Sequence, residues 1–155
     1  MMAKYSKNIY EQMVLAAKKA YPNECCGILV GKKSEQSEIE VTEIREAENQ
    51  FQGQKAAHFK IDPLYLYHVE QELETRSLEI VGIYHSHPDG PAILSKEDEE
   101  YMIPGLEYVI MSVQNGEVVD VKSYKKAMPP LNSNNHKLLS NDQQPSAIEK
   151  INKFA

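Results

Sequence analysis

Two histidines, His85 and His87, stand two positions apart at the end of an apolar stretch. The stretch 78–84 is rich in β-branched and aromatic residues, which favours a β-strand. Because side chains at positions i and i+2 of a strand point to the same side, we expect the two imidazoles to converge at the strand's carboxyl end. Pro88 and the turn sequence at 89–91 should end the strand there.

A hydroxyl and a carboxylate follow at the start of the next element. Ser95 suits the N-cap of a helix, and Asp98 suits its third position. Two neutral imidazoles and one carboxylate make three ligands and leave a fourth tetrahedral position for water, which is typical of catalytic rather than structural zinc. Each motif alone is more often structural. Found together at a strand end, they predict one Zn²⁺ per chain, bound by His85, His87 and Asp98.

Glu24 is the candidate for a fourth participant. A metal-activated water needs a base that accepts its proton and delivers it to a leaving amine. Glu24 stands after a predicted helix end and at the entrance of an apolar strand that begins at Cys26. Burial there would raise its pKa toward neutrality, as a general base requires. Without the histidines, a solvent-facing glutamate at a strand end would be the better interpretation.

The segments 24–27 and 85–98 together resemble the signature of the JAMM (MPN-plus) metalloprotease family. That signature has an upstream glutamate, then His-Ser/Thr-His, seven residues, a serine, two residues and an aspartate, and every position is filled here. The resemblance extends from the first predicted helix to about Tyr124. It implies a zinc-dependent hydrolase of peptide or isopeptide bonds at the C-terminus of a ubiquitin-like protein. The roles it implies are zinc ligation by His85, His87 and Asp98, general base and acid catalysis by Glu24, and oxyanion stabilisation by Ser95.

The spacing between Glu24 and Asp98 leaves no room for long insertions, which is similar to the stand-alone prokaryotic members of that family. Those members resemble enzymes that trim small β-grasp sulfur-carrier proteins, either removing a C-terminal extension or releasing cysteine from a carrier–cysteine adduct. A β-grasp carrier is therefore the expected substrate partner. Its extended tail could lie along an exposed strand edge beside the metal by strand addition, with the segments 47–58 and 89–94 as walls of the groove.

The remaining patterns predict the elements that position these residues. We expect helices at 6–20, 62–77 and from Ser95 to about 104, and strands at 26–31, 38–46, 59–61, 78–84, 108–113 and 117–124. Asn115-Gly116 is the strongest hairpin signal. This order predicts an α+β fold with a central mixed, largely antiparallel sheet covered by helices, and the resemblance implies a JAMM/MPN-like, cytidine-deaminase-like architecture. Residues 1–126 would form the domain, and 127–155 a Pro/Asn-rich linker and tail with a short helix at 147–154.

Composition narrows the classes of function. The net charge of −6 and the absence of a Lys/Arg stripe argue against a nucleic-acid partner. There is no apolar run of membrane-spanning length and no signal-peptide-like N-terminus, so no membrane partner is expected. Cys25 and Cys26 are adjacent and have no other cysteine to pair with, which favours a reducing, cytoplasmic location. A homo-oligomer stays open.

Other classes of protein fit the sequence less well. A metal-dependent phosphoesterase can also begin with His-x-His but needs further ligands, and the remaining histidines, His58, His68 and His136, lack a partner carboxylate at a strand end. A zinc deaminase would need His-x-Glu and Pro-Cys-x-x-Cys, which are missing. A structural zinc site would be closed by four ligands, commonly cysteines. A catalytically silent binding or scaffold module of the same fold is the alternative from another class.

Overall fold

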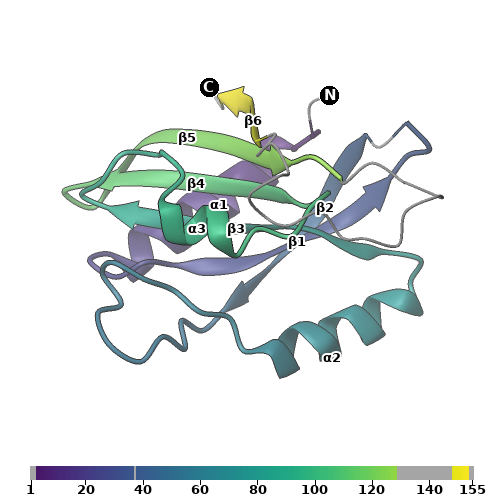
Figure 1. The fold of residues 1–155 in the computed structure, drawn as a ribbon, viewed down its shortest axis with the longest axis horizontal. Helices are drawn as coiled ribbons and strands as arrows, with labels where there is room; N and C mark the ends of the chain where they lie inside the picture. Colours follow the sequence, from purple (N-terminus) through teal and green to yellow (C-terminus); the bar gives the residue numbers. More distant parts are fainter. Residues whose placement is uncertain (1–2, 37, 129–147, 154–155) are drawn as a thin grey trace, which may run out of the picture.

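The computed structural model describes residues 3–36, 38–128 and 148–153, which form one sheet and three helices (Figure 1). The six strands lie in the order β2-β1-β3-β4-β5-β6. β3 and β4 run parallel, and the other neighbouring strands pair antiparallel, so the predicted mixed, largely antiparallel sheet is confirmed. The strands are β1 (Cys26–Lys33), β2 (Ile39–Ala47), β3 (Glu79–Pro88), β4 (Glu107–Gln114), β5 (Glu117–Lys126) and β6 (Ile148–Lys153).

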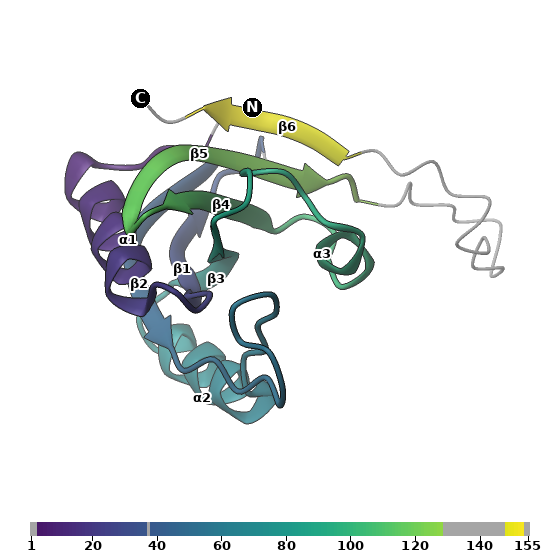
Figure 2. The same ribbon diagram turned by 90° about the vertical axis from the view of Figure 1, so that its left-hand side faces the viewer.

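The helices cover both faces of the sheet. α1 (Lys7–Ala20) lies on one face, whereas α2 (Pro63–Glu74) and the short α3 (Lys96–Glu100) lie on the other (Figure 2). Each central strand contributes side chains to both apolar layers: on β4, Val109 and Met111 pack in the α1 layer, and Ile110 packs in the α2 layer. Burial on both faces explains why the central strands read as continuous apolar runs. None of the described helices is long and apolar enough to span a membrane.

Local signals in the sequence account for most element ends. Ser6 caps α1 by accepting a hydrogen bond from the Ile9 N–H, and Asp62 caps α2 by accepting one from the Leu64 N–H. Asn115 and Gly116 have φ angles of 50° and 79°, which is the geometry of a two-residue hairpin turn between β4 and β5. These predicted boundaries are confirmed to within a few residues.

Two short elements differ from the prediction. The strand expected at 59–61 does not form. The Lys60 carbonyl accepts the Gln50 N–H at 2.8 Å and the Lys60 N–H donates to Asn49 Oδ1 at 3.2 Å, so both backbone groups bond inside the loop at 48–62. The helix from Ser95 ends at Glu100 rather than near 104. Pro104 disfavours helical geometry at Ile103, and the Ile103 N–H donates to the Tyr108 hydroxyl at 2.7 Å.

The prediction of a helix at 147–154 is wrong. Residues 148–153 form β6, which pairs antiparallel with β5 from Lys126↔Ile148 to Lys122↔Lys153. β5 would otherwise leave a row of backbone groups unpaired along its outer edge, and pairing these groups overrides the local helical pattern. The part of the predicted linker at 129–147 lies outside the described residues.

Candidate metal centre

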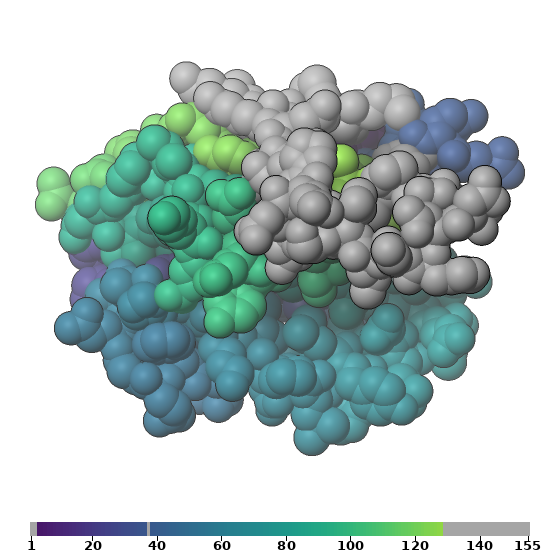
Figure 3. All heavy atoms as spheres, in the orientation of Figure 1, coloured from purple at the N-terminus to yellow at the C-terminus, as the bar shows by residue number. Residues whose placement is uncertain are grey.

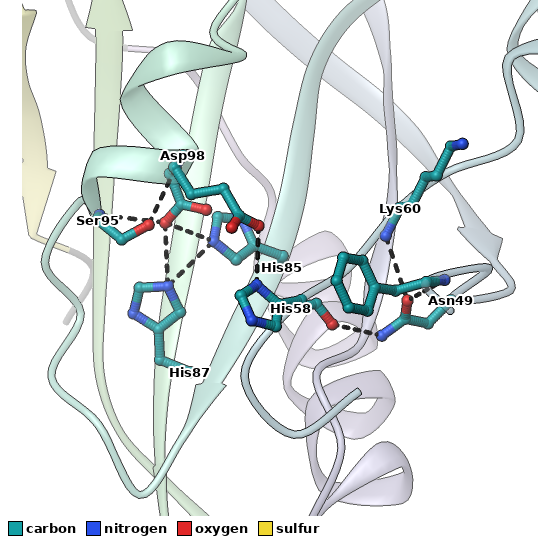
Figure 4. A network of polar contacts seen from close by, with 9 residues as sticks. Asn49, His58, Lys60, His85, His87, Ser95 and Asp98 are labelled. Carbon is teal, nitrogen blue, oxygen red and sulfur yellow. Dashed lines mark hydrogen bonds and ion pairs between the residues drawn. The ribbon is translucent and has the colours of Figure 1, made fainter. Parts of the chain in front are cut away.

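The side chains of His85, His87 and Asp98 point toward one another above the end of β3 (Figure 4). The two Nε2 atoms are 3.2 Å apart, and Asp98 Oδ2 lies 3.2 Å from His85 Nε2 and 3.1 Å from His87 Nε2. A tetrahedral ion with bonds of about 2.0 Å would hold its ligand atoms about 3.3 Å apart. The three atoms therefore form a triangle of the size that a zinc ion needs, as the strand and cap predictions led us to expect.

The contact made by the other ring nitrogen of His87, Nδ1, determines the tautomer of this histidine. His87 Nδ1 lies 2.8 Å from the Pro91 carbonyl oxygen, which can only accept, so Nδ1 carries the hydrogen and donates it. When the ring is neutral, Nε2 carries the lone pair and presents it to the triangle. The loop that supplies this carbonyl is attached to β4, since the Asp89 N–H donates to the Val113 carbonyl and the Ser112 hydroxyl donates to the Gly90 carbonyl, each at 2.6 Å.

The pKa shifts of His85 and Asp98 suit a divalent cation. Burial alone would lower the pKa of His87, but hydrogen bonds with Asp98 and the Pro91 carbonyl raise it. Burial lowers the pKa of His85, whose ring is 1% exposed and stacks on Phe59 with ring centroids 4.4 Å apart. Burial alone would raise the pKa of Asp98. Hydrogen bonds with His85 and His87 outweigh burial and hold this pKa well below its usual range. A neutral imidazole and an ionised carboxylate are the forms that bind zinc.

Asp98 is oriented by the first turn of α3. Ser95 Oγ accepts the Asp98 N–H at 3.0 Å, and Asp98 Oδ2 accepts the Ser95 N–H at 3.2 Å, which completes a capping box. The same Oδ2 faces both histidines. Accepting the Asp98 N–H still leaves the Ser95 hydroxyl hydrogen available for donation, so the capping contact and an oxyanion contact use different parts of one group.

Glu24 lies at the edge of the triangle, as predicted. It is 5% exposed, and one of its carboxylate oxygens lies within 4.8 Å of ligand nitrogens of both His85 and His87. Its Oε1 is buried without a hydrogen-bond partner among the described residues. Burial raises the pKa of Glu24 to about 8, and the positive field of His87 opposes this only partly. A carboxylate with these properties can exchange a proton near neutral pH.

The antiparallel pairing of β1 with β3 brings Glu24 to this place. Cys26 pairs with His85, so the residues just before β1 lie beside the end of β3. The Ser86 Oγ accepts the Cys25 N–H at 2.8 Å and the Ser86 N–H donates to the Cys25 carbonyl at 3.2 Å. Gly27 has no side chain to obstruct the Tyr84 ring, whose atoms would lie 2.2 Å from a Cβ there.

Glu24, His85 and His87 also form a group of donors that could hold a metal without Asp98. Two carboxylates thus flank the same pair of imidazoles. Asp98 Oδ2 is in direct contact with both Nε2 atoms, whereas the nearest Glu24 oxygen makes no such contact and lies within 4.8 Å of the ligand nitrogens. The distances favour Asp98 over Glu24 as the third ligand beside the two histidines.

Two cavities meet at the triangle and share Phe59, Glu97 and Asp98 in their walls. One, of about 330 Å³, is lined by the small residues Ala56, Ala57, Gly90 and Ser95 and by larger ones that include Glu24, His58 and His87. The other, of about 550 Å³, is mainly apolar and is lined by Phe51, Ile61, Leu66, Ile83, Tyr101, Ile103 and Tyr108. In Figure 3 the green-teal atoms of α3 lie against the blue atoms of the loop at 48–62, the two segments that line these cavities.

The predicted strand addition of a substrate tail needs a strand edge near the histidines. β3 lies between β1 and β4; the register with β1 reaches His85, and the register with β4 reaches Pro88. The predicted groove walls at 47–58 and 89–94 do contribute residues to the cleft, including Ala56, Ala57 and Gly90. Addition of a substrate tail as a further strand beside the metal stays a prediction.

Two residues of this site were not identified from the sequence. His58 Nδ1 lies 2.9 Å from Glu97 Oε1, which joins the loop to α3. Asn49 donates to the His58 carbonyl inside the loop and to the Glu24 carbonyl before β1. Both lie in a polar, irregular stretch without periodicity, and their partners are distant in the sequence. No spacing rule could have paired them.

The fold and the ligand cluster define a JAB/MPN-type domain that carries a metal-binding signature. Residues 6–125 match the family of prokaryotic homologs of the JAB domain, and the chain belongs to this family. The predicted resemblance to the JAMM/MPN-plus group of this fold is thereby confirmed.

Curated relatives and solved structures agree with this assignment. The chain is 32% identical over 93 residues to a desampylase of Pyrococcus furiosus and 30% identical over 92 residues to a desampylase of Haloferax volcanii. These alignments cover 60% and 59% of this chain, and only 61% and 63% of the two relatives.

A protein from Desulfitobacterium hafniense has a TM-score of 0.70 and 30% identity, covering 81% of this chain and 85% of its own. A protein from Salinibacter ruber has a TM-score of 0.60 and 29% identity, covering 81% and 82%. A JAB1/MPN domain protein from Archaeoglobus fulgidus, at 20% identity, a TM-score of 0.50 and coverage of 80% and 86%, supports the fold alone.

Proposed function

We propose that the chain is a zinc-dependent hydrolase of peptide or isopeptide bonds at the C-terminus of a ubiquitin-like protein, with a β-grasp sulfur carrier as the expected substrate. The observation that carries this proposal is the triangle of His85, His87 and Asp98 with the buried carboxylate of Glu24 within 4.8 Å of both imidazoles. The likeness to two proteins named desampylase supports a substrate of the ubiquitin-like class.

The chemistry divides among the residues as follows. Zinc held by His85, His87 and Asp98 would polarise the scissile carbonyl and lower the pKa of a water molecule. Glu24, a buried carboxylate beside the ligand triangle, accepts a proton from that water and then delivers it to the leaving amine. The Ser95 hydroxyl, which lines the same cavity, donates to the oxygen on which negative charge develops.

The two cavities suggest how a substrate chain crosses the site. A tail of small residues such as glycine fits the smaller cavity beside Ala56, Ala57 and Gly90. The larger apolar cavity then receives the part of the substrate on the other side of the cleaved bond. The bond itself lies where the cavities meet, at Asp98.

Substitution of Glu24 by glutamine tests the proposed base. We expect Glu24→Gln to retain zinc but to lose hydrolysis of a β-grasp carrier by roughly 10²–10⁴-fold, the usual contribution of a general base. His85→Ala should lose both zinc and hydrolysis. Cleavage would be followed by mass spectrometry of carriers that bear a C-terminal extension. Full activity of Glu24→Gln would show that the base is assigned wrongly.

The zinc content of the wild-type protein addresses the alternative of a silent binding module. Stoichiometric zinc together with carrier cleavage supports the hydrolase, whereas a protein that stays metal-free after careful zinc loading favours a scaffold. A phosphatase activity that chelators abolish, without any peptidase activity, would favour the phosphoesterase instead. Within the described residues, the potential metal ligands gather in the one cluster around His85 and His87, which supports a single ion rather than the two or three of many phosphoesterases.

A further inference from the structure

The side chain of Asn49 makes four hydrogen bonds, which use every position that an amide offers. Its Nδ2 donates to the Glu24 carbonyl at 3.2 Å and to the His58 carbonyl at 2.9 Å. Its Oδ1 accepts the Phe51 N–H at 3.1 Å and the Lys60 N–H at 3.2 Å. Since carbonyls only accept and N–H groups only donate, a single orientation of the amide satisfies all four partners. Figure 4 shows the amide between His58 and Lys60.

The Asn49 side chain thereby holds the main chain of Glu24. Glu24 precedes β1, and both of its backbone groups bond to the loop: its N–H donates to the Lys55 carbonyl at 2.8 Å, and its carbonyl accepts from Asn49. The Glu24 carboxylate has one oxygen without a hydrogen-bond partner among the described residues, so no hydrogen bond of its own holds that oxygen. The position of the carboxylate therefore depends on the loop, and Asn49 is the side chain that links the loop to Glu24.

The same amide also fixes the loop against the metal site. Asn49 bonds to the residues on either side of Phe59, and the Phe59 ring stacks on His85 with centroids 4.4 Å apart. The neighbouring His58 contacts Glu97 of α3 at 2.9 Å. Asn49 lies outside both cavity linings and does not contact the ligand triangle.

We propose that Asn49 is a positioning residue that places Glu24 opposite the metal, a role that rests on the proposed hydrolase function. Asn49 acts through the backbone of Glu24 and through the loop, not by contact with substrate or zinc. Losing it should displace the base while leaving the zinc ligands on β3 and α3 in place. Displacements of about 1 Å in such groups cost up to roughly a hundredfold in rate.

The variant Asn49→Asp tests this with little change in shape. A carboxylate still accepts from Phe51 and Lys60, but it cannot donate to the carbonyls of Glu24 and His58 and would repel both oxygens. Gln50→Glu is the matched control, because it makes the same amide-to-carboxylate change one residue away on an exposed side chain. Asn49→Ala removes the amide without adding charge and serves if Asn49→Asp fails to fold.

We expect kcat for carrier cleavage to fall by roughly 10- to 100-fold in Asn49→Asp and Asn49→Ala, with zinc affinity unchanged and Gln50→Glu close to wild type. Hydrogen exchange should accelerate in the peptide that contains Glu24, in the Asn49 variants only. The proposal is overturned if kcat and exchange at Glu24 match those of the wild type, or if zinc affinity falls as much as kcat. An inactive wild type would reject the proposed hydrolase, whereas the exchange measurement would still show whether Asn49 holds Glu24.

Discussion

Glu24 and Asp98 are two carboxylates beside the same pair of imidazoles, but their surroundings move their pKa values in opposite directions. Burial dominates at Glu24 and raises its pKa to about 8. At Asp98, hydrogen bonds from His85 and His87 outweigh burial and keep the pKa low. Two carboxyl groups whose pKa values differ in this way commonly have different tasks: one transfers protons and the other stays charged. This supports the division between proton transfer and zinc binding.

A further carboxylate, the buried Glu107, lies outside the site and gives a stability test at the residue scale. It is 1% exposed on β4 and accepts a hydrogen bond from the Ser123 hydroxyl at 2.6 Å. Burial raises its pKa, and the contacts with Ser123 and Lys125 offset this only partly. The folded state therefore binds this proton more tightly than the unfolded chain, so its contribution to stability is present below about pH 4 and is lost as the pH rises through the folded pKa.

Glu107→Gln should accordingly gain free energy of unfolding relative to the wild type as the pH rises from 4 to 7. Urea unfolding at a series of pH values measures this difference. Glu79→Gln, an exposed glutamate at the start of β3, controls for the loss of one negative charge. A difference between Glu107→Gln and wild type that stays constant with pH would contradict the raised pKa.

At the scale of elements, the sequence predicts those parts whose signals are local. The apolar runs of β1, β3 and β4, the caps Ser6 and Asp62 and the Asn115-Gly116 turn each depend on neighbouring residues. The length of α3 and the pairing of β6 depend instead on contacts with other elements. The Ile103 N–H donates to the Tyr108 hydroxyl, and β6 pairs with the outer edge of β5. Neither contact leaves a periodic pattern in the sequence.

The segment between α3 and β4 forms one wall of the apolar cavity and permits a matched comparison. Ile103 lies in that wall and is 56% exposed, and Ile93 is also 56% exposed but belongs to neither cavity lining. If a substrate side chain seats there, Ile103→Asp should raise KM for a carrier by roughly tenfold, the usual scale for one apolar contact, with kcat and zinc content retained. Ile93→Asp should leave KM unchanged. Steady-state kinetics on both variants decide this, and equal effects of the two changes would exclude the cavity as a substrate site.

At the scale of the whole molecule, the site forms where three distant parts of the chain meet. The antiparallel β1–β3 pair brings Glu24 beside His85, α3 supplies Asp98, and the loop at 48–62 closes the other side. The ligand and base candidates could be predicted because their residue types and spacing carry chemical information. Asn49 and the His58–Glu97 contact could not, since these partners lie 25 and 39 positions away and only the folded loop brings them together. The domain boundary at 126 and the cytoplasmic location stay predictions.

Equilibrium zinc binding to the wild type, Asp98→Asn and Glu24→Gln tests the metal centre most directly, because both carboxylates flank the same two histidines. We expect one zinc per chain in the wild type, near-wild-type affinity in Glu24→Gln and a large loss of affinity in Asp98→Asn. The reverse order, with zinc retained in Asp98→Asn and lost in Glu24→Gln, would show that Glu24 is the ligand and would contradict its assignment as the base.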